Sequence, residues 1–251
     1  MTAIDGKAPA ANTATTTAPA TVSVPVSTIR AMLLAAGKGE RMRPLTLNTP
    51  KPLLPVAGKP LIEYHIERLV AVGVRDIVIN VSWLGEQIEE YCGDGSRWGC
   101  DLRYSREPEP LETAGGIIQA LPLLGDNPFV LVNADIWTDF DFEKLLSMPL
   151  PKQAAHLVLV DNPEHNIVGD FSLEAGSVQL PSTKTLTYAG IGLYDPLFFK
   201  GFAPGKRALL PLLQRAIEES RLFAEHHLGH WTDVGTPKRL EALEHRLLAS
   251  N

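Results

Sequence analysis

The stretch IRAMLLAAGKGERMRPLTLNTPKP, residues 29–52, decides the fold of this chain. It opens with a continuous apolar run, which is typical of a strand buried on both faces of a parallel sheet. The run leads into a loop with Gly37 and Gly39, which therefore lies at the carboxyl end of the strand, where open α/β sheets bind ligands. Glycines let backbone amides approach a phosphate closely, and Lys38 and Arg41 add positive charge. The stretch therefore predicts a phosphate-binding loop.

Two commoner kinds of phosphate loop do not fit these residues. The P-loop pattern GxxxxGK followed by Ser or Thr is absent, and Met42 occupies the third glycine position of the dinucleotide pattern GxGxxG. A glycine pair after a strand can also form a plain turn, so the loop alone leaves that alternative open. Lys51, between Pro50 and Pro52, is either an exposed lysine in a rigid loop or a fixed cation that stabilises phosphoryl transfer.

Apolar strand-like runs alternate with helix-like segments along the rest of the chain. We expect further strands over residues 74–82, 101–107, 128–135 and 154–161, and helices over residues 61–73, 84–92, 112–124, 141–148, 208–221 and 236–249. Continuous apolar strands between helices predict the α/β class, with a Rossmann-like, mainly parallel sheet that helices cover on both faces. Residues 171–195 have the pattern of hairpin strands with turns, which predicts a small antiparallel insert.

Composition and charge exclude several classes of protein. Of 251 residues, 45% are hydrophobic and 21% charged, and the formal net charge is −6. No apolar run approaches the roughly eighteen residues of a membrane span, and no broad basic field suggests binding to nucleic acid or to anionic membranes. Cys92 and Cys100 are too few for a disulfide framework and fit free thiols in a reducing compartment. We therefore expect a cytoplasmic protein.

The first 28 residues differ from the rest in composition. They are mainly Ala, Thr, Pro, Val and Ser, without an aromatic side chain or helical periodicity. Such a segment buries too little apolar surface to offset its chain entropy, so residues 1–28 are predicted to form a disordered tail. Residues 29–251 are predicted to form a single domain.

The residues after the glycine loop follow a long pattern. From Gly37 to Pro52 they resemble the signature GxGxRxxPxTxxxPKP of the sugar-1-phosphate nucleotidylyltransferases, and the segments VNAD, VDNP, GDF and HWTDVGT match that family in order. Glu40 departs from the signature, because most members have Thr or Ser there. The segment GKGERMRPLT is similar to the branch that transfers a uridylyl group from UTP to N-acetylmuramic acid 1-phosphate in peptidoglycan recycling. The resemblance implies the nucleotide-diphospho-sugar transferase fold, with a sugar-binding insert at about residues 161–195.

The resemblance also implies which residues bind the nucleotide. In the family, the glycine loop and the lysine of Pro-Lys-Pro hold the triphosphate, and the segment that reads PLETAGGI in this chain contacts the base. The structural alternative for that segment is a helix start with Thr113 as its cap. The implied nucleotide-binding residues are Ala36, Gly37, Lys38, Gly39, Glu40, Arg41, Lys51, Glu112, Gly115 and Gly116, of which Arg41 and Lys51 are the catalytic candidates.

Two aspartates are candidate metal ligands. Asp135 ends the apolar segment VLVNAD, and Asp233 lies in HWTDVGT, although each could instead be a helix cap or a turn residue. As a pair they offer the hard oxygen ligands that Mg²⁺ prefers, and the resemblance implies magnesium ligands at these two positions. His226, His227 and His230 lack a recognised zinc spacing, so no zinc site is expected there.

The sugar side depends on weaker signals. Many members of the family have a Glu-Lys-Pro run whose lysine touches the sugar phosphate, but this chain has none, and Lys184 is only a distant candidate. Asp170, which follows Gly169, could bind the sugar or form a turn. The candidate sugar-binding residues are Asn80, Asn133, Asp135, Asp161, Asn162, Asp170, Tyr188 and Gly190.

The implied reaction joins a sugar 1-phosphate to UTP and releases pyrophosphate, with Mg²⁺ as cofactor. Its attacking group is an already ionised phosphate oxygen, so no catalytic dyad or triad is needed. The alternatives are a mannose-1-phosphate guanylyltransferase, a glucose-1-phosphate thymidylyltransferase, and a non-catalytic subunit that binds nucleotide sugars. The last is disfavoured because Arg41, Lys51, Asp135 and Asp233 are all present. We expect a monomer or a small homo-oligomer.

Overall fold

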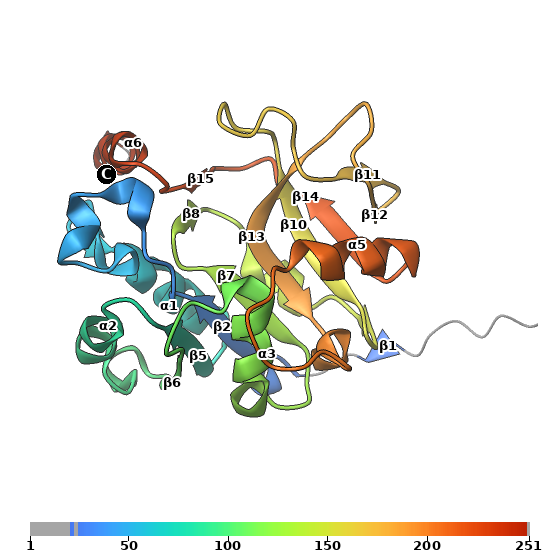
Figure 1. Cartoon of the computed structure of the whole chain (residues 1–251), viewed down its shortest axis with the longest axis horizontal. Coiled ribbons are helices and arrows are strands. Elements are labelled where there is room, and N and C mark those ends of the chain that lie inside the picture. Colours follow the sequence, from blue (N-terminus) through green and yellow to red (C-terminus); the bar gives the residue numbers. More distant parts are fainter. Residues whose placement is uncertain (1–20, 23–24, 250–251) are drawn as a thin grey trace, which may run out of the picture.

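A nine-stranded mixed sheet forms the centre of the molecule in the computed structural model, which describes residues 21–22 and 25–249 (Figure 1). In chain order its strands are β2 (Arg30–Leu34), β5 (Asp76–Val81), β6 (Asp101–Arg106), β7 (Phe129–Asn133), β10 (Ala155–Val160), β11 (Ser172–Glu174), β12 (Ser177–Gln179), β13 (Thr187–Tyr194) and β14 (Leu222–His226). They lie side by side in the order β11-β12-β14-β10-β13-β7-β2-β5-β6.

The strands β7, β2, β5 and β6 run parallel to one another and form the half of the sheet that leads into the glycine loop. Leu34 of β2 lies opposite Asn80 of β5 and Asn133 of β7, so these strands end at nearly the same level. β13 runs antiparallel to both β7 and β10, and β11 and β12 form an antiparallel hairpin. The arrangement confirms the predicted α/β class, with a parallel core and an antiparallel addition.

Helices cover both faces of this sheet, as the alternation of strands and helices predicts. They are α1 (Leu61–Ala71), α2 (Gly85–Cys92), α3 (Glu112–Leu124), α4 (Phe142–Leu146) and α5 (Leu210–Glu218). α1, α2 and α4 pack on one face, and α3 and α5 pack on the other. Successive residues of β2 point to opposite faces, so Ala31 and Leu33 contact the first group of helices and Met32 contacts the second.

A third, smaller layer lies beside the glycine loop. It contains β8 (Ile136–Thr138), which pairs antiparallel with β15 (Trp231–Asp233), and the C-terminal helix α6 (Pro237–Ala249). Met42 and Leu243 belong to the buried apolar cluster that joins this layer to the segment after the glycine loop. Figure 1 shows α6 next to the blue segment that follows β2. The C-terminal part of the chain is therefore packed against the residues of the predicted phosphate loop.

Part of the predicted N-terminal tail has regular structure. The strand β1 (Thr21–Val22) pairs antiparallel with β9 (Leu150–Pro151), and a 3-10 helix spans Val26–Thr28. Val26 is half-buried and packs against the core. These segments differ from the predicted disorder because they find partners in the folded domain, whereas residues 1–20 and 23–24 of the predicted tail lie outside the described residues.

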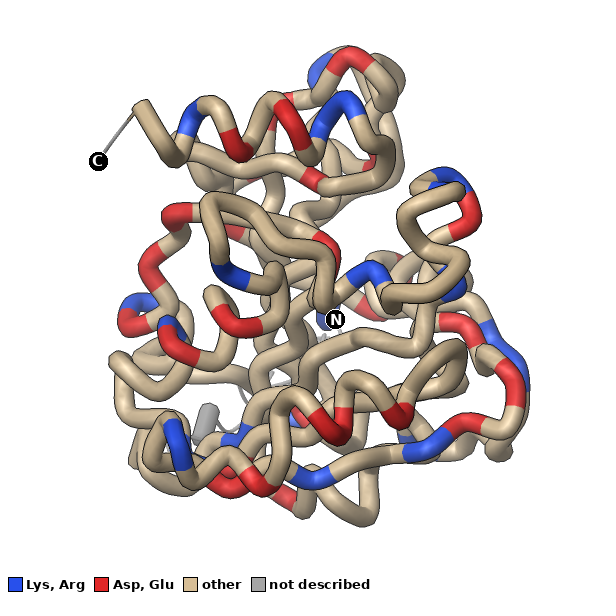
Figure 2. Tube along the Cα trace, turned by 90° about the vertical axis from the view of Figure 1, so that its left-hand side faces the viewer, with Lys and Arg blue, Asp and Glu red and all other residues tan. Residues whose placement is uncertain are grey.

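Charges of both signs are mixed over the face of the molecule drawn in Figure 2. The helix α6 carries both signs, since Lys238 and Arg239 are followed by Glu241, Glu244 and Arg246. Within the described ranges, no helix combines the length and the apolar character needed to cross a membrane.

Candidate active site

The carboxyl ends of the parallel strands meet at one cavity. Leu34, Asn80 and Asn133, which are neighbours in the register of three adjacent strands, all line it. Gly37 and Lys51 also line this cavity, and both continue into a second one. The predicted phosphate loop therefore lies at the edge of the sheet where parallel α/β folds bind ligands.

The second cavity, which we call the phosphate cleft, gathers the cations that the sequence predicts for a triphosphate. Lys38, Arg41 and Lys51 all line it, together with Glu40, the residue that departs from the family signature. The exposed Glu40 side chain lies 3.7 Å from the guanidinium of Arg43, so its charge is partly compensated within the loop. The glycine loop is therefore the wall of a cleft rather than only a turn between two elements.

Gly39 determines the shape of that wall. It has a φ of +62°, a left-handed conformation that residues with a side chain rarely adopt. A Cβ atom at this position would lie only 2.9 Å from Cγ2 of Thr46. The hydroxyl of Thr46 donates a 2.7 Å hydrogen bond to the carbonyl oxygen of Gly39. The threonine of the signature thus holds the loop, and Gly39 has no room for a side chain.

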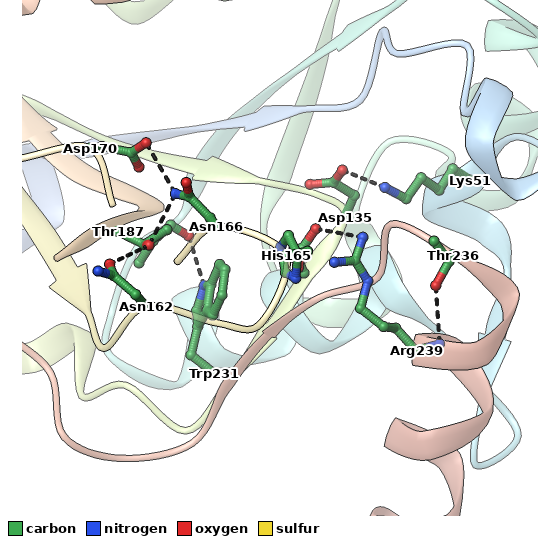
Figure 3. A network of polar contacts seen from close by, with 12 residues as sticks. Lys51, Asp135, Asn162, His165, Asn166, Asp170, Thr187, Trp231, Thr236 and Arg239 are labelled. Atoms are coloured by element: carbon green, nitrogen blue, oxygen red, sulfur yellow. Dashed lines mark hydrogen bonds and ion pairs between the residues drawn. The ribbon is translucent and has the colours of Figure 1, made fainter. Parts of the chain in front are cut away.

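Lys51 is a buried cation within the cleft. It begins the 3-10 helix Lys51–Leu53, directly after the extended residue Pro50, and its side chain is only 9% exposed. Its Nζ atom donates to Oδ2 of Asp135 at 2.5 Å (Figure 3). The alternative of an exposed lysine in a rigid loop is therefore wrong, because the surrounding chain buries this charge and supplies a carboxylate for it.

The second aspartate is brought next to the first by strand pairing. β15 pairs with β8 so that Asp233 lies opposite Ile136, and the amide of Val234 donates a 2.8 Å hydrogen bond to the carbonyl oxygen of Asp135. One oxygen of Asp233, Oδ2, lies 3.1 Å from the guanidinium of Arg239. The two predicted metal ligands are thus neighbours, with Asp233 at the end of β15 and Asp135 directly before β8, although 98 residues separate them in the sequence.

The other oxygen of Asp233 lacks a hydrogen bond. Oδ1 is buried and lies 2.9 Å from Nε2 of His165, but the contact does not have the geometry of a hydrogen bond. A buried carboxylate oxygen without a donor is costly, which suits an atom that ligates a cation. Among the described residues no cluster of three or more His, Cys, Asp or Glu could hold a metal. Two carboxylates fit Mg²⁺, which is usually held by one or two carboxylates plus water and phosphate oxygens.

A buried polar network closes the cavity at the strand ends. Asn80 accepts a hydrogen bond from the amide of Ala35 at 2.8 Å and donates to Oε1 of Glu107 at 2.6 Å. The other oxygen of Glu107 accepts from the amide of Leu111 at 2.8 Å. Asn80, a predicted sugar-binding residue, therefore lines the cavity but uses its amide to join β2 to the segment that leads into α3.

The two glycines predicted to contact the base are packed inside the protein. A Cβ atom on Gly115 would lie 2.4 Å from the carbonyl oxygen of Gly205, and one on Gly116 would lie 2.5 Å from Oε1 of Glu107. Neither glycine lines the cavities at the sheet edge. Glu112 does line them, with an unusual positive φ of +60°. The helix has Leu111 as its N-cap and no side-chain cap, so the predicted Thr113 cap is absent.

A third cavity of about 700 Å³, which we call the sugar cavity, lies against the insert. Asn133, Asp170 and Tyr188 line it. Asp170 accepts hydrogen bonds from the amide of Tyr188 at 2.8 Å and from the side chain of Asn166 at 3.1 Å (Figure 3). Burial raises the pKa of the Tyr188 phenol, so this hydroxyl stays protonated.

Gly190 also shapes the sugar cavity. It has a φ of +74°, and a Cβ atom on it would lie 2.5 Å from the side-chain nitrogen of Asn133. Because no side chain intervenes, Asn133 can pack directly on β13 while it faces the cavity. Gly190, a predicted sugar-binding residue, does not itself line the sugar cavity.

Two predicted sugar-binding residues lie away from the sugar cavity. The Asp161 side chain is 81% exposed and pairs with His226 at 3.0 Å. Asn162 donates to the hydroxyl of Thr185 at 3.0 Å and accepts from that of Thr187 at 2.9 Å, which fastens the loop after β10 to the start of β13. Neither residue lines the cavities at the sheet edge.

Four residues of the site were missed by the sequence analysis. Glu107 could have been suspected, because it is a polar residue at the carboxyl end of the predicted strand over residues 101–107. His165 contacts Asp233 from a distant loop, Arg239 contacts it from the first turn of α6, and Lys206 lines the phosphate cleft from a loop without a motif. No local signal in the sequence marks these three.

The nucleotidyl transferase family model matches residues 30–171, which is more than half of the chain. The chain belongs to the nucleotidyl transferase family. It is 52% identical over 221 residues to the N-acetylmuramate alpha-1-phosphate uridylyltransferase of Neisseria meningitidis serogroup B, a match that covers 85% of this chain and 96% of that protein. It is 32% identical over 225 residues to the mannose-1-phosphate guanylyltransferase catalytic subunit beta of Xenopus tropicalis, where 84% of this chain matches 62% of the relative.

Solved structures share the nucleotidyl transferase fold of this chain. A Bacillus anthracis protein assigned as a glucose-1-phosphate thymidylyltransferase matches with a TM-score of 0.76 at 20% identity, over 87% of this chain and 94% of that one. HddC from Yersinia pseudotuberculosis matches with a TM-score of 0.73 at 18% identity, over 87% of this chain and 99% of that one. The resemblance drawn from the glycine loop, and the fold that it implies, are confirmed.

Proposed function

We propose that this nucleotidyl transferase transfers a uridylyl group from UTP to N-acetylmuramic acid 1-phosphate, which gives UDP-N-acetylmuramic acid and pyrophosphate. The observation that carries the reaction type is the phosphate cleft, in which the glycine loop faces the Lys51–Asp135 pair beside Asp233. The identity of 52% to the neisserial uridylyltransferase, over nearly all of that protein, supports UTP and this sugar as substrates.

The chemistry requires positioning and charge neutralisation more than proton transfer. A phosphate oxygen of the sugar 1-phosphate attacks the α-phosphorus of UTP, the bond from that phosphorus to the bridging oxygen breaks, and pyrophosphate leaves with the electron pair. Arg41, Lys51 and the amides of the glycine loop would bind the triphosphate and stabilise its developing charge. Asp135 and Asp233 would hold Mg²⁺, which supplies further neutralisation of phosphate charge when bound.

We assign the base to the cavity at the strand ends. Ala36 and Thr113 line this cavity, and the hydrogen-bonded Asn80–Glu107 pair lies at its edge. This assignment leaves the sugar cavity, which shares Glu112, Thr113 and Asn133 with the first, for the acceptor substrate.

The lining of the sugar cavity has a consequence for the lactyl group of N-acetylmuramic acid. Among the described residues that line it there is no Lys or Arg, whereas Glu112 and Asp170 both contribute carboxylates. An unpaired buried carboxylate is costly, so the lactyl carboxylate would point toward solvent. Apolar contacts from Leu180, Leu210 and Leu213 are available to the sugar's methyl groups instead.

A screen for pyrophosphate release tests the proposed function. Five nucleoside triphosphates are assayed with N-acetylmuramic acid 1-phosphate and with the 1-phosphates of N-acetylglucosamine, glucose and mannose. We expect the highest kcat/KM for UTP with N-acetylmuramic acid 1-phosphate. A preference for GTP with mannose 1-phosphate, or for dTTP with glucose 1-phosphate, would overturn the substrate assignment.

A further inference from the structure

One cation of the phosphate cleft comes from outside the family signature. Lys206 lines the cleft together with Gly37, Arg41 and Lys51, but it belongs to the loop that precedes α5. Its side chain is 66% exposed and has room to move. By contrast, Lys51 is buried and already paired with Asp135.

The loop of Lys206 is anchored to the start of α3. The amide of Arg207 donates a 2.8 Å hydrogen bond to the carbonyl of Leu111, and the amide of Gly115 donates a 3.1 Å hydrogen bond to the carbonyl of Arg207. The loop can approach this closely only because Gly115 lacks a side chain, since a Cβ atom would lie 2.4 Å from the carbonyl oxygen of Gly205. The backbone that carries Lys206 is therefore anchored, while its side chain is exposed.

Lys206 has a weak carboxylate partner, Glu112. Its Nζ atom lies 3.9 Å from Oε1 of Glu112, and both side chains are well exposed, at 66% and 46%. Such a solvent-screened pair contributes little, so a doubly charged phosphate can displace the carboxylate easily. Glu112 lines the phosphate cleft and also the sugar cavity. The ammonium group is therefore held at the junction where the two substrates must meet.

The insert offers no equivalent cation. Lys184 is the one Lys or Arg between residues 161 and 195. It is exposed on the loop between β12 and β13 and does not line the phosphate cleft or the sugar cavity. A sugar 1-phosphate that enters through the sugar cavity would meet Lys206 rather than Lys184.

We propose that Lys206 binds the phosphate of the sugar 1-phosphate, after exchanging Glu112 for that phosphate, and so positions it for attack on the nucleotide. The proposal rests on the proposed function for the reaction type but not for the identity of the sugar. It gives this chain a phosphate contact that its insert does not provide.

Steady-state kinetics with the full-length chain test this assignment. Lys206→Ala should raise the KM for the sugar 1-phosphate about tenfold, the size of a lost charge-assisted contact, while the KM for UTP changes less than about twofold. Lys206→Arg should restore most of the affinity, because a guanidinium also binds phosphate. Lys200→Ala removes an equal charge from an exposed position outside the three cavities and should behave as the wild type.

Binding without turnover gives a second readout. By calorimetry, Lys206→Ala should bind the UDP-sugar product about tenfold more weakly but UTP with unchanged affinity. The assignment would be overturned if Lys206→Ala left the KM for the sugar 1-phosphate unchanged, or raised the KM for UTP more than that for the sugar 1-phosphate. It would also be overturned if Lys184→Ala, rather than Lys206→Ala, raised the KM for the sugar 1-phosphate. If the wild type turns over no sugar 1-phosphate at all, the proposed function fails. If the wild type is active and Lys206→Ala is equally active, only the role of Lys206 fails.

Discussion

The Nε2 atom of His65 lies 2.8 Å from the carbonyl oxygen of Ile136, the residue that follows Asp135. Because a carbonyl can only accept, Nε2 carries the proton, and Nδ1 is left buried without a hydrogen-bond partner. Burial lowers the pKa of His65 from 6.5 to about 4. The imidazole is therefore neutral in the folded protein and joins α1 to the strand beside the aspartate.

This environment predicts an acid-sensitive stability. Between pH 6.5 and about pH 4 the unfolded chain protonates His65 and the folded chain does not. The contribution of His65 to the free energy of unfolding is therefore fully present above pH 6.5. It decreases as the pH falls toward about 4, by at most about 1.4 kcal/mol per pH unit. Urea unfolding of the wild type and of His65→Gln at pH 7.5, 6 and 5 measures the difference. Parallel losses of stability in both proteins would contradict this prediction.

Substitution of either metal-ligand candidate should abolish most activity. Asp135→Asn and Asp233→Asn remove a negative charge that Mg²⁺ requires, so we expect kcat to fall by at least about a hundredfold, or about 2.7 kcal/mol. Magnesium titrations of the rate, with circular dichroism to verify folding, provide the measurement. Asp126→Asn, at an exposed position, is the matched control. Near-normal turnover of a variant at saturating magnesium would show that the substituted residue is not a ligand.

Replacement of Gly39 separates backbone strain from damage to the cleft. Gly39→Ala combines a positive φ with a 2.9 Å contact to Thr46, so the glycine loop must shift. We expect activity to fall about a hundredfold and stability by about 1–2 kcal/mol. Gly58→Ala has a φ of +80° but no atom within 4 Å of the new Cβ. It should show a similar loss of stability in thermal unfolding without the loss of activity, and equal activity of the two variants would contradict the role of the loop.

Selectivity for the lactyl group should be modest. The sugar cavity supplies no described Lys or Arg for the carboxylate, so N-acetylglucosamine 1-phosphate should be a poorer but detectable substrate. The ratio of kcat/KM for the two sugars measures the selectivity. A preference above about a thousandfold, or about 4 kcal/mol, would mean that a dedicated carboxylate site exists.

Local patterns in the sequence predicted most of the fold. The continuous apolar runs correspond to β2, β5, β7 and β10. The helix expected over residues 141–148 begins at Asp141, and in the structure Asp141 caps α4 by accepting a hydrogen bond from the amide of Glu143. These features depend on neighbouring residues, so the sequence shows them directly. The glycine loop was recognisable for the same reason.

Features that depend on distant contacts were not predictable in this way. The pairing of β15 with β8, the contact of His165 with Asp233, and the position of Lys206 arise from the packing of segments far apart in the chain. The strand β1 (Thr21–Val22) was missed because it finds its partner in β9, more than a hundred residues later. Gly115 resembles a ligand contact in the sequence, but the structure shows that it makes room for a neighbouring loop.

The pairing of β8 with β15 also has a consequence for the synthesis of the protein. A ribosome-bound chain that has not yet reached residue 231 contains Lys51 and Asp135, but it lacks the strand that contributes Asp233. Domains generally fold as units, so we expect the sheet and its edge to reach their final packing only after β15 has emerged from the ribosome. The proposed metal site therefore depends on residues that are among the last of this chain to be synthesised.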